Sequence, residues 1–410
     1  MTFAVHATEW KRPFLERYFP DRCFHFPPKA LTDRDIEQIW RPRILAEEQC
    51  EFFVWGPELP PAFAALATAR DIPVWFIEDG FLRSARASAS RTPPLSLALD
   101  SRTPYFDCCK ASDLETLLNT YDFEGDQPLM ARARAGIKLL LDGGISKYND
   151  ARDQTAEEAY GEKTRKRVLV IGQVEDDASI RYGCLTPMSN NDLVRLASAE
   201  QPVAQILYKP HPDVLSRVRP AKSDPAEVAH LCRIVTERLP LSEALRTVDH
   251  VYTITSLAGF EAILRGIEVT TAGCPFYSGW GLTDDRQPNP RRGRALSIEA
   301  LFAGAYLLYP RYFDPETGAQ TSFEATVAAI KKQLGEQEAW SRPTPPAWAA
   351  WGPYGFLGWR HLLTAAVAPA IRHLGNDRDV EDFRADPIRF FRSLSDRRLR
   401  IIGRILYPFG

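Results

Sequence analysis

The sequence predicts an α/β protein with two doubly wound lobes and a C-terminal helical extension. The chain has 410 residues, which is too long for one ordinary core. Short apolar runs that suit buried strands alternate with helical segments in two separate stretches. A polar segment at 150–166, rich in Glu, Lys and Arg, separates these stretches as a linker and helix region. We therefore expect lobes at 1–150 and 165–335 and an extension at 338–410.

The first lobe is predicted from two apolar runs with a helix between them. Strands are expected at 52–56 and 73–77, and a helix at 62–69. Because both strands are apolar throughout, we expect them to pair in parallel inside a covered sheet. A second helix is predicted at 113–118, with Ser112 as its N-cap.

The second lobe shows the same alternation more strongly. Four buried strands are predicted, at 167–172, 205–210, 249–253 and 268–273. Three helices fit between them, at 191–200, 241–248 and 257–265. This order predicts a Rossmann-like lobe, and two such lobes would face each other across a cleft.

Composition excludes several classes of protein. The hydrophobic content of 45% and charged content of 25% are typical of a folded globular protein, and the net charge of −2 argues against a nucleic-acid partner. Seven scattered Cys without a CxxC pair fit neither a disulfide framework nor a zinc site, so we expect reduced thiols in a cytoplasmic protein. The absence of a Walker loop, a GxGxxG sequence and metal-ligand spacing argues against ATP, NAD and metal cofactors.

Membrane insertion is not expected. The N-terminal residues lack a basic segment followed by an apolar one, so no secretory signal is predicted. The most apolar run, 362–371, is about half the length that a membrane-spanning helix needs.

Four polar segments follow predicted strands, where a doubly wound lobe binds its ligands. The first holds three adjacent carboxylates, Glu175, Asp176 and Asp177. They fit either a solvated acidic turn or helix cap, or a nucleophile or general base acting at a sugar carbon.

The second segment is Lys209-Pro210-His211-Pro212. Two prolines stiffen the turn, while Lys209 and His211 bring positive charge to one region, which favours an anionic phosphate. A surface turn with an uninvolved histidine is the alternative.

The third segment runs from Thr253 to Glu261. The hydroxyls of Thr255 and Ser256 precede an apolar helix, whose free N–H groups attract an anion, and Glu261 is placed to reach ribose hydroxyls. Simple N-capping by Ser256 would give the same sequence pattern.

The fourth segment, Glu78 to Ser84, follows a strand of the first lobe. Its carboxylates can serve an acceptor hydroxyl from the opposite side of the cleft. A structural pair between Asp79 and Arg83 is equally compatible with the sequence.

The C-terminal segment 384–410 is basic and amphipathic, with seven Arg against two Asp among Phe, Ile and Leu residues. Such a stretch can lie on anionic lipid. The alternative is a helix that packs back on the lobes.

Together these segments resemble a known family, the capsule-polysaccharide Kdo transferases of the KpsC type. The resemblance runs from about residue 50 to residue 320. Its sequence boxes are Glu78–Ser84, Pro93–Leu97, Ser112–Glu115, Ser146–Asn149, Gln173–Asp176, His211–Pro212, Thr255–Glu261, Pro275–Gly281 and Tyr309–Pro315.

The resemblance implies a GT-B-like fold and a retaining, metal-independent β-Kdo transferase that uses CMP-β-Kdo and needs no cofactor. Asp176 would be the nucleophile that forms a transient Kdo adduct, with Glu175 supporting it, and Gln173 would lie at the donor site. Glu78 would be the base for the acceptor hydroxyl, with Asp79 as the substitute.

The remaining boxes would bind the donor. Lys209 and His211 would hold the phosphate and help CMP to leave. Thr255 and Ser256 would contact the same phosphate, and Glu261 would contact the ribose.

The expected partners are a nucleotide-sugar donor and a surface-polysaccharide or glycolipid acceptor, with peripheral contact to the inner membrane or to capsule-assembly proteins. Longer members of the family carry two modules in tandem, so this single module is expected to add one linkage. Two alternatives stay open. One is another CMP-sugar or a phosphoribosyl donor on the same fold, and the other is a non-catalytic module of capsule assembly.

Overall fold

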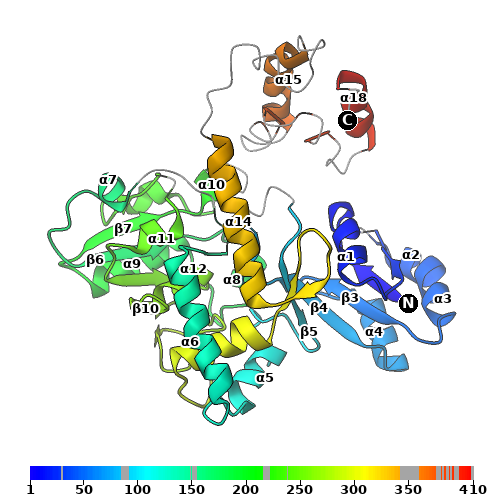
Figure 1. Cartoon of the computed structure of the whole chain (residues 1–410), viewed down its shortest axis with the longest axis horizontal. Helices are drawn as coiled ribbons and strands as arrows, with labels where there is room; N and C mark the ends of the chain where they lie inside the picture. The colour runs from blue at the N-terminus through cyan, green and yellow to red at the C-terminus, as the bar shows by residue number, and fades with distance from the viewer. Residues whose placement is uncertain are drawn as a thin grey trace. The chain divides into compact units, whose positions relative to one another are not determined.

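The computed structural model divides the chain into two compact units. The first unit is Met1–Pro210 with Lys222–Lys332, and the second is His211–Ala221 with Gln333–Gly410. The described residues are 1–28, 31–84, 92–147, 149, 155–215, 222–237, 239–341, 360–374, 380, 383–384, 387, 390–391 and 397–407. Both sheets belong to the first unit (Figure 1).

The first sheet has seven strands in the order β13-β12-β5-β4-β3-β1-β2. Their bounds are β1 Thr2–Val5, β2 Phe24–His25, β3 Glu51–Trp55, β4 Val74–Asp79, β5 Ser96–Asp100, β12 Arg311–Phe313 and β13 Gln320–Thr321. The first four strands in the chain pair in parallel, as predicted for β3 and β4, whereas β5, β12 and β13 pair antiparallel with their neighbours. This sheet is therefore mixed rather than wholly parallel.

Apolar residues on both faces explain why the strands read as continuous apolar runs. Phe52 and Val54 lie in one core cluster with Phe3, while Phe53 lies in the cluster on the other face with Ile77. Successive residues of a strand point to opposite faces, so a strand covered on both sides is apolar throughout. The covering helices are α1 Arg12–Tyr18, α2 Asp33–Asp35, η2 Ile36–Trp40, α3 Arg41–Leu45 and α4 Pro61–Arg70.

The second sheet has six strands, all parallel to their neighbours, in the order β11-β10-β9-β6-β7-β8. Their bounds are β6 Arg167–Ile171, β7 Gln205–Lys209, β8 Arg233–Ile234, β9 His250–Thr253, β10 Glu268–Thr271 and β11 Asp284–Asp285. The helices are α7 Ala156–Tyr160, α8 Ala178–Arg181, α9 Asn190–Glu200, η4 Pro225–Val228, α11 Leu241–Leu245 and α12 Leu257–Ile263. The four strands predicted here are confirmed to within two residues at each end. Of the predicted linker, residues 150–154 lie outside the described range, and α7 occupies its centre.

The chain returns to the first sheet after completing the second. Helix α13 (Ile298–Phe302) and the wider helical turn η5 (Ala303–Leu308) lead into β12, which pairs with β5. Strands β12 and β13 thus belong to the first sheet, although they lie within the range 165–335 expected for the second lobe. Helices α5 (Asp113–Thr120) and α6 (Gln127–Asp142) pack near this returning segment (Figure 1).

Two groups of side chains join the sheets within this unit. Phe81, which follows β4, lies 4.6 Å from Phe276 and 5.4 Å from Tyr306 between ring centroids. Glu115 of α5 is buried and accepts a hydrogen bond of 2.6 Å from Arg291 and one of 3.1 Å from Arg292. A buried carboxylate with two guanidinium partners keeps its charge compensated away from water.

The second unit holds α10 (Pro212–Leu215), α15 (Arg360–Leu374) and α18 (Arg397–Leu406), and α14 (Phe323–Ser341) runs into it from the first unit. Its small core is formed by residues of α15, of the segment between α15 and α18, and by the residue after α18: Ala368, Ile371, Val380, Phe383, Phe391 and Tyr407. The predicted helical extension is thus present. No helix among the described residues combines the length and the apolar character needed to cross a membrane.

Replacing Glu115 by Gln should lower the free energy of unfolding by about 3 kcal/mol, because the buried Arg292 loses its compensating charge. Urea denaturation measures this change. The same replacement at exposed Glu124 is the control and should alter stability by less than about 0.5 kcal/mol. Equal effects of the two replacements would contradict the assignment of Glu115 as a buried interlobe tie.

Candidate active site

The predicted donor residues lie at the carboxyl edge of the second sheet. Strands β9, β6 and β7 are neighbours in that order, and each is followed by one of the predicted segments. Parallel strands end at the same edge, so the loops after them converge there.

Gln173 links two of these loops. Its side-chain N–H donates to Thr255 Oγ1 at 3.0 Å, and the Thr255 N–H donates back to Gln173 Oε1 at 2.8 Å. Its backbone N–H donates to Asn190 Oδ1 at 2.9 Å. Gln173 and Thr255 are therefore brought together, and the Gln173 amide fixes the loop geometry.

Glu175 and Asp177 have donors of their own within the second lobe. Glu175 accepts from the N–H groups of Asn190 and Ser223, each at 2.8 Å, and from the Ser223 hydroxyl. Asp177 caps α8 by accepting from the Ser179 N–H at 2.9 Å. These bonds compensate two of the three adjacent carboxylates.

Asp176 lies between these two anchored carboxylates and is half-buried. Because Glu175 and Asp177 are both tied into the fold, they hold the turn that carries Asp176 in place. This arrangement is compatible with the predicted nucleophile, whose role stays a prediction.

In the first lobe Glu78 and Asp79 are the last two residues of β4, rather than residues after the strand as predicted. Asp79 Oδ2 accepts from Arg83 Nε at 2.7 Å, and Arg83 is 1% exposed. The structural pair between Asp79 and Arg83 that the sequence left open is thus present.

Glu78 is half-buried and lies among several charges. The pKa of its carboxyl group is raised to about 7, mainly by burial. Lys11 and Lys147 lower this pKa, while Asp79 and Asp177 raise it. A carboxyl group with a pKa near neutrality suits a general base. Of the two candidates, Glu78 therefore has the more favourable environment.

Asp177 of the acidic turn raises the pKa of Glu78 at the end of β4, although the two residues belong to different lobes. The same side carries further interlobe contacts, because Arg181 pairs with Glu58 at 3.5 Å and the Tyr182 hydroxyl donates to Glu58. The predicted carboxylates of the acceptor side and of the donor side are therefore close enough to influence each other's charge.

Lys209 is the last residue of β7, and its ammonium donates to the Glu237 carbonyl at 3.1 Å. Burial lowers the pKa of Lys209 to about 8, and Glu237 partly offsets this effect. His211 opens the segment of the second unit, where its carbonyl accepts from the N–H groups of Val214 and Leu215. A joint role for Lys209 and His211 at a phosphate stays a prediction.

Ser256 is the N-cap of α12, since its Oγ accepts from the Ala258 N–H at 3.2 Å. The capping alternative is therefore present, and the hydroxyl hydrogen is still able to donate to a ligand.

Glu261 is 3% exposed. It accepts from the Lys147 N–H at 3.3 Å and pairs with Arg265 at 3.7 Å. Burial raises the pKa of Glu261 to about 7, and a ribose contact stays a prediction.

Several residues at this site were not singled out from the sequence: Lys11, Asn190 and Ser223. Lys147 lies in the predicted box Ser146–Asn149, but no role was assigned to it. Asn190 and Ser223 bind Glu175, while Lys11 and Lys147 act on Glu78. These residues and their partners are separated in the chain, so no local sequence pattern connected them. The apolar residues Phe3–Val5 would have indicated β1, the strand that leads toward Lys11.

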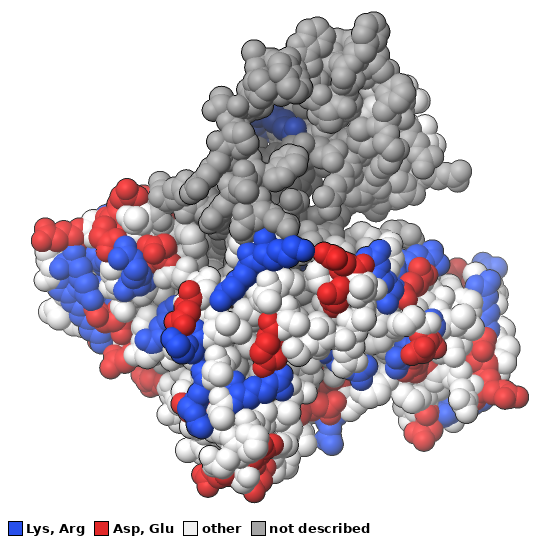
Figure 2. Space-filling model, viewed as in Figure 1, with Lys and Arg blue, Asp and Glu red and all other residues white. Residues whose placement is uncertain are grey.

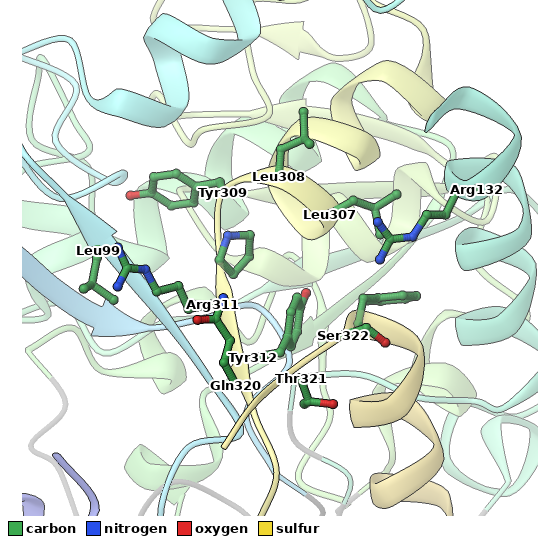
Figure 3. Close-up of a pocket in the computed structure, with 12 residues that line it drawn as sticks. Leu99, Arg132, Leu307, Leu308, Tyr309, Arg311, Tyr312, Gln320, Thr321 and Ser322 are labelled. Carbon is green, nitrogen blue, oxygen red and sulfur yellow. The ribbon is translucent and has the colours of Figure 1, made fainter. Parts of the chain in front are cut away.

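A cavity of about 470 Å³ lies elsewhere in the first unit, beside β12 and β13 (Figure 3). Figure 3 shows Tyr309 and Arg311 on one side of it and Arg132 and Ser322 on the other. None of the predicted site residues lines this cavity.

Across the residues the structure describes, no three His, Cys, Asp or Glu side chains are grouped to hold a metal ion. On the face drawn in Figure 2, basic and acidic side chains are intermixed.

Known proteins with similar sequences come from bacterial surface-polysaccharide systems. The chain is 43% identical over 330 residues to the lipopolysaccharide-processing protein LpsZ of Rhizobium meliloti, which covers 80% of this chain and 73% of LpsZ. It is 39% identical to the capsule polysaccharide modification protein LipA of Neisseria meningitidis serogroup B, over 82% of this chain and 46% of LipA. The chain thus spans about half the length of LipA.

Two solved structures of Thermosulfurimonas dismutans KpsC are similar to this one. The beta Kdo 2,4 transferase gives a TM-score of 0.65 at 32% identity, over 81% of this chain and 98% of that chain. The beta Kdo 2,7 transferase gives 0.62 at 29% identity, over 81% and 99%. The predicted two-lobed, GT-B-like α/β fold is confirmed. Residues 54–312 match the family model described as capsule polysaccharide biosynthesis protein, and the chain belongs to this family.

Proposed function

We propose that this protein is a retaining β-Kdo glycosyltransferase that moves Kdo from CMP-β-Kdo to a surface-polysaccharide or glycolipid acceptor. The observation that carries the proposal is that the loops after β6 and β9 meet at one edge of the second sheet, where Gln173 and Thr255 exchange two hydrogen bonds. They lie in a chain similar over 81% of its length to KpsC modules named as beta Kdo transferases.

Asp176 begins the reaction in this proposal. One of its carboxylate oxygens bonds to the anomeric carbon of Kdo while the bond from that carbon to the CMP phosphate breaks. The half-buried position of Asp176, between two carboxylates that are already hydrogen-bonded, supports this role. CMP leaves as a phosphate monoester whose charge needs nearby cations and hydrogen-bond donors.

In this proposal Lys209 and the hydroxyls of Thr255 and Ser256 supply these groups without a metal ion, and His211 is retained as a further candidate. With a pKa of about 8, Lys209 is mostly charged at neutral pH. Thr255 Oγ1 and Ser256 Oγ each accept one bond from within the protein, which leaves their hydroxyl hydrogens able to donate to a phosphate oxygen. Glu261 is proposed to contact the ribose.

Glu78 completes the transfer. It takes the proton of an acceptor hydroxyl, whose oxygen then attacks the anomeric carbon and releases Asp176. Two displacements at the anomeric carbon restore its starting configuration, so the transfer proceeds with retention of configuration. Asp79 is less suited to this step because it is paired with Arg83.

Replacing Asp176 by Asn should reduce transfer from CMP-Kdo by at least about 10³-fold while CMP still binds, because the amide cannot form the adduct. Product formation is followed by chromatography, beside CMP-sialic acid and a phosphoribosyl donor. Exposed Asp142, replaced by Asn, is the matched control and should keep full activity. Wild-type rates in the Asp176 variant would exclude it as the nucleophile.

We also propose that the protein works in the cytoplasm at the inner face of the inner membrane, through α18. The sequence of α18 has four Arg and no acidic residue. Gly403 packs on Phe391 and Tyr407 is buried, whereas Ile401 and Ile405 are 48% and 70% exposed. Exposed isoleucines on a basic helix fit an anionic bilayer surface.

Replacing Ile401 and Ile405 together by Ser should weaken binding to vesicles containing phosphatidylglycerol by about tenfold, because less apolar area is buried in the lipid. Co-sedimentation measures the binding. Val203, which is 79% exposed in the first unit, is replaced by Ser as the control. Vesicle binding unchanged by the double replacement would leave α18 with a packing role alone.

A further inference from the structure

Lys11 is an almost buried cation at the edge of the first sheet where the candidate base lies. It is the last residue of the short turn η1 (Glu9–Lys11) and is 9% exposed. Its backbone N–H donates to the Thr8 carbonyl at 2.8 Å, which fixes the turn after β1. A buried ammonium group is unfavourable unless opposite charge or other polar partners lie nearby.

An aromatic ring holds this ammonium group in place. Lys11 Nζ lies 3.2 Å from the ring centroid of Trp55, the last residue of β3, and 5.7 Å from that of Trp10. A cation over the face of Trp is attracted by the negative charge of the ring face, and the attraction grows when water is excluded. Trp55 therefore fixes the position of the Lys11 charge.

The same strand edge places Glu78 beside Trp55. Strands β3 and β4 are parallel, with Trp55 opposite Ile77, and Glu78 is the next residue. Gly56 has φ of +93°, and a Cβ atom built on it would lie 3.9 Å from Glu78 Oε1. The Glu78 carboxylate thus lies above the residue that follows Trp55.

We propose that Lys11 is a positioning residue for the candidate base, whose Trp55-held ammonium keeps the Glu78 carboxylate ionised so that it can accept a proton. This role rests on the proposed function, in which Glu78 takes the proton of the acceptor hydroxyl. Lys11 itself does not touch the reacting atoms.

The charges around Glu78 support this assignment. Asp79 on the same strand and Asp177 on the opposite lobe both disfavour ionisation of Glu78, while Lys11 and Lys147 favour it. Lys11 has the largest effect of these four charges. Of these four charges, only Lys147 would then favour ionisation of Glu78.

The test replaces Lys11 by Met, which keeps the apolar stem but removes the charge, and by Arg, which keeps the charge over an aromatic ring. The titration of Glu78 is followed by ¹³C NMR of its side-chain carboxyl carbon, assigned with Glu78→Gln. We expect Lys11→Met to raise the Glu78 pKa from about 7 by about one unit and Lys11→Arg to change it little.

Transfer rates across pH give the second readout. A carboxyl group that must be ionised loses rate as pH falls through its pKa, so raising the pKa moves this loss to higher pH. At pH 7 the ionised fraction would fall from about one half to about one tenth, and kcat/KM of Lys11→Met about fivefold. At about pH 9 the difference should largely disappear, which a merely structural defect would not produce.

An unchanged Glu78 titration in Lys11→Met would overturn the inference. If the titration shifts as expected but Glu78→Gln transfers Kdo at the wild-type rate, the base assignment fails and Lys11 has no role in the reaction. The two failures are therefore distinguishable, because the first concerns the pairing itself and the second concerns what Glu78 does.

Discussion

A buried carboxylate ties the two sheets of the first unit together. Glu115 comes from α5, and its partners Arg291 and Arg292 follow the last strand of the second sheet. Arg292 continues the connection by donating to the Ser278 carbonyl at 2.8 Å, within the predicted box 275–281. Breaking this network would leave an uncompensated buried charge. The network therefore stabilises the position of the loops of one lobe against the other.

The geometry of the candidate site follows from this tie. The acidic turn after β6 and the end of β4 belong to different sheets, yet Asp177 acts electrostatically on Glu78. A double-displacement enzyme needs its nucleophile and its base on either side of one sugar carbon. Fixed lobes supply such an arrangement more reliably than side chains on a single mobile loop.

Three carboxylates of the candidate site have structural partners. Glu175 holds the start of α9 and Ser223, Asp177 caps α8, and Asp79 pairs with Arg83. Carboxylates already occupied by donors are poor candidates for bond formation or proton transfer. Of the two candidate bases, Glu78 is therefore better placed than Asp79 for the proposed proton transfer.

The sequence alone determined the strands of the second lobe, the helix caps at Ser112 and Ser256, and the polar segments at strand ends, since each depends on neighbouring residues. The tertiary structure alone decided the return of β12 to the first sheet and the placing of Lys11 over Trp55, whose partner in β4 precedes Glu78. These contacts depend on strand order, which joins residues far apart in the chain. Local sequence patterns do not predict such pairings, because the free energy that favours one strand pairing over another comes from the packed core.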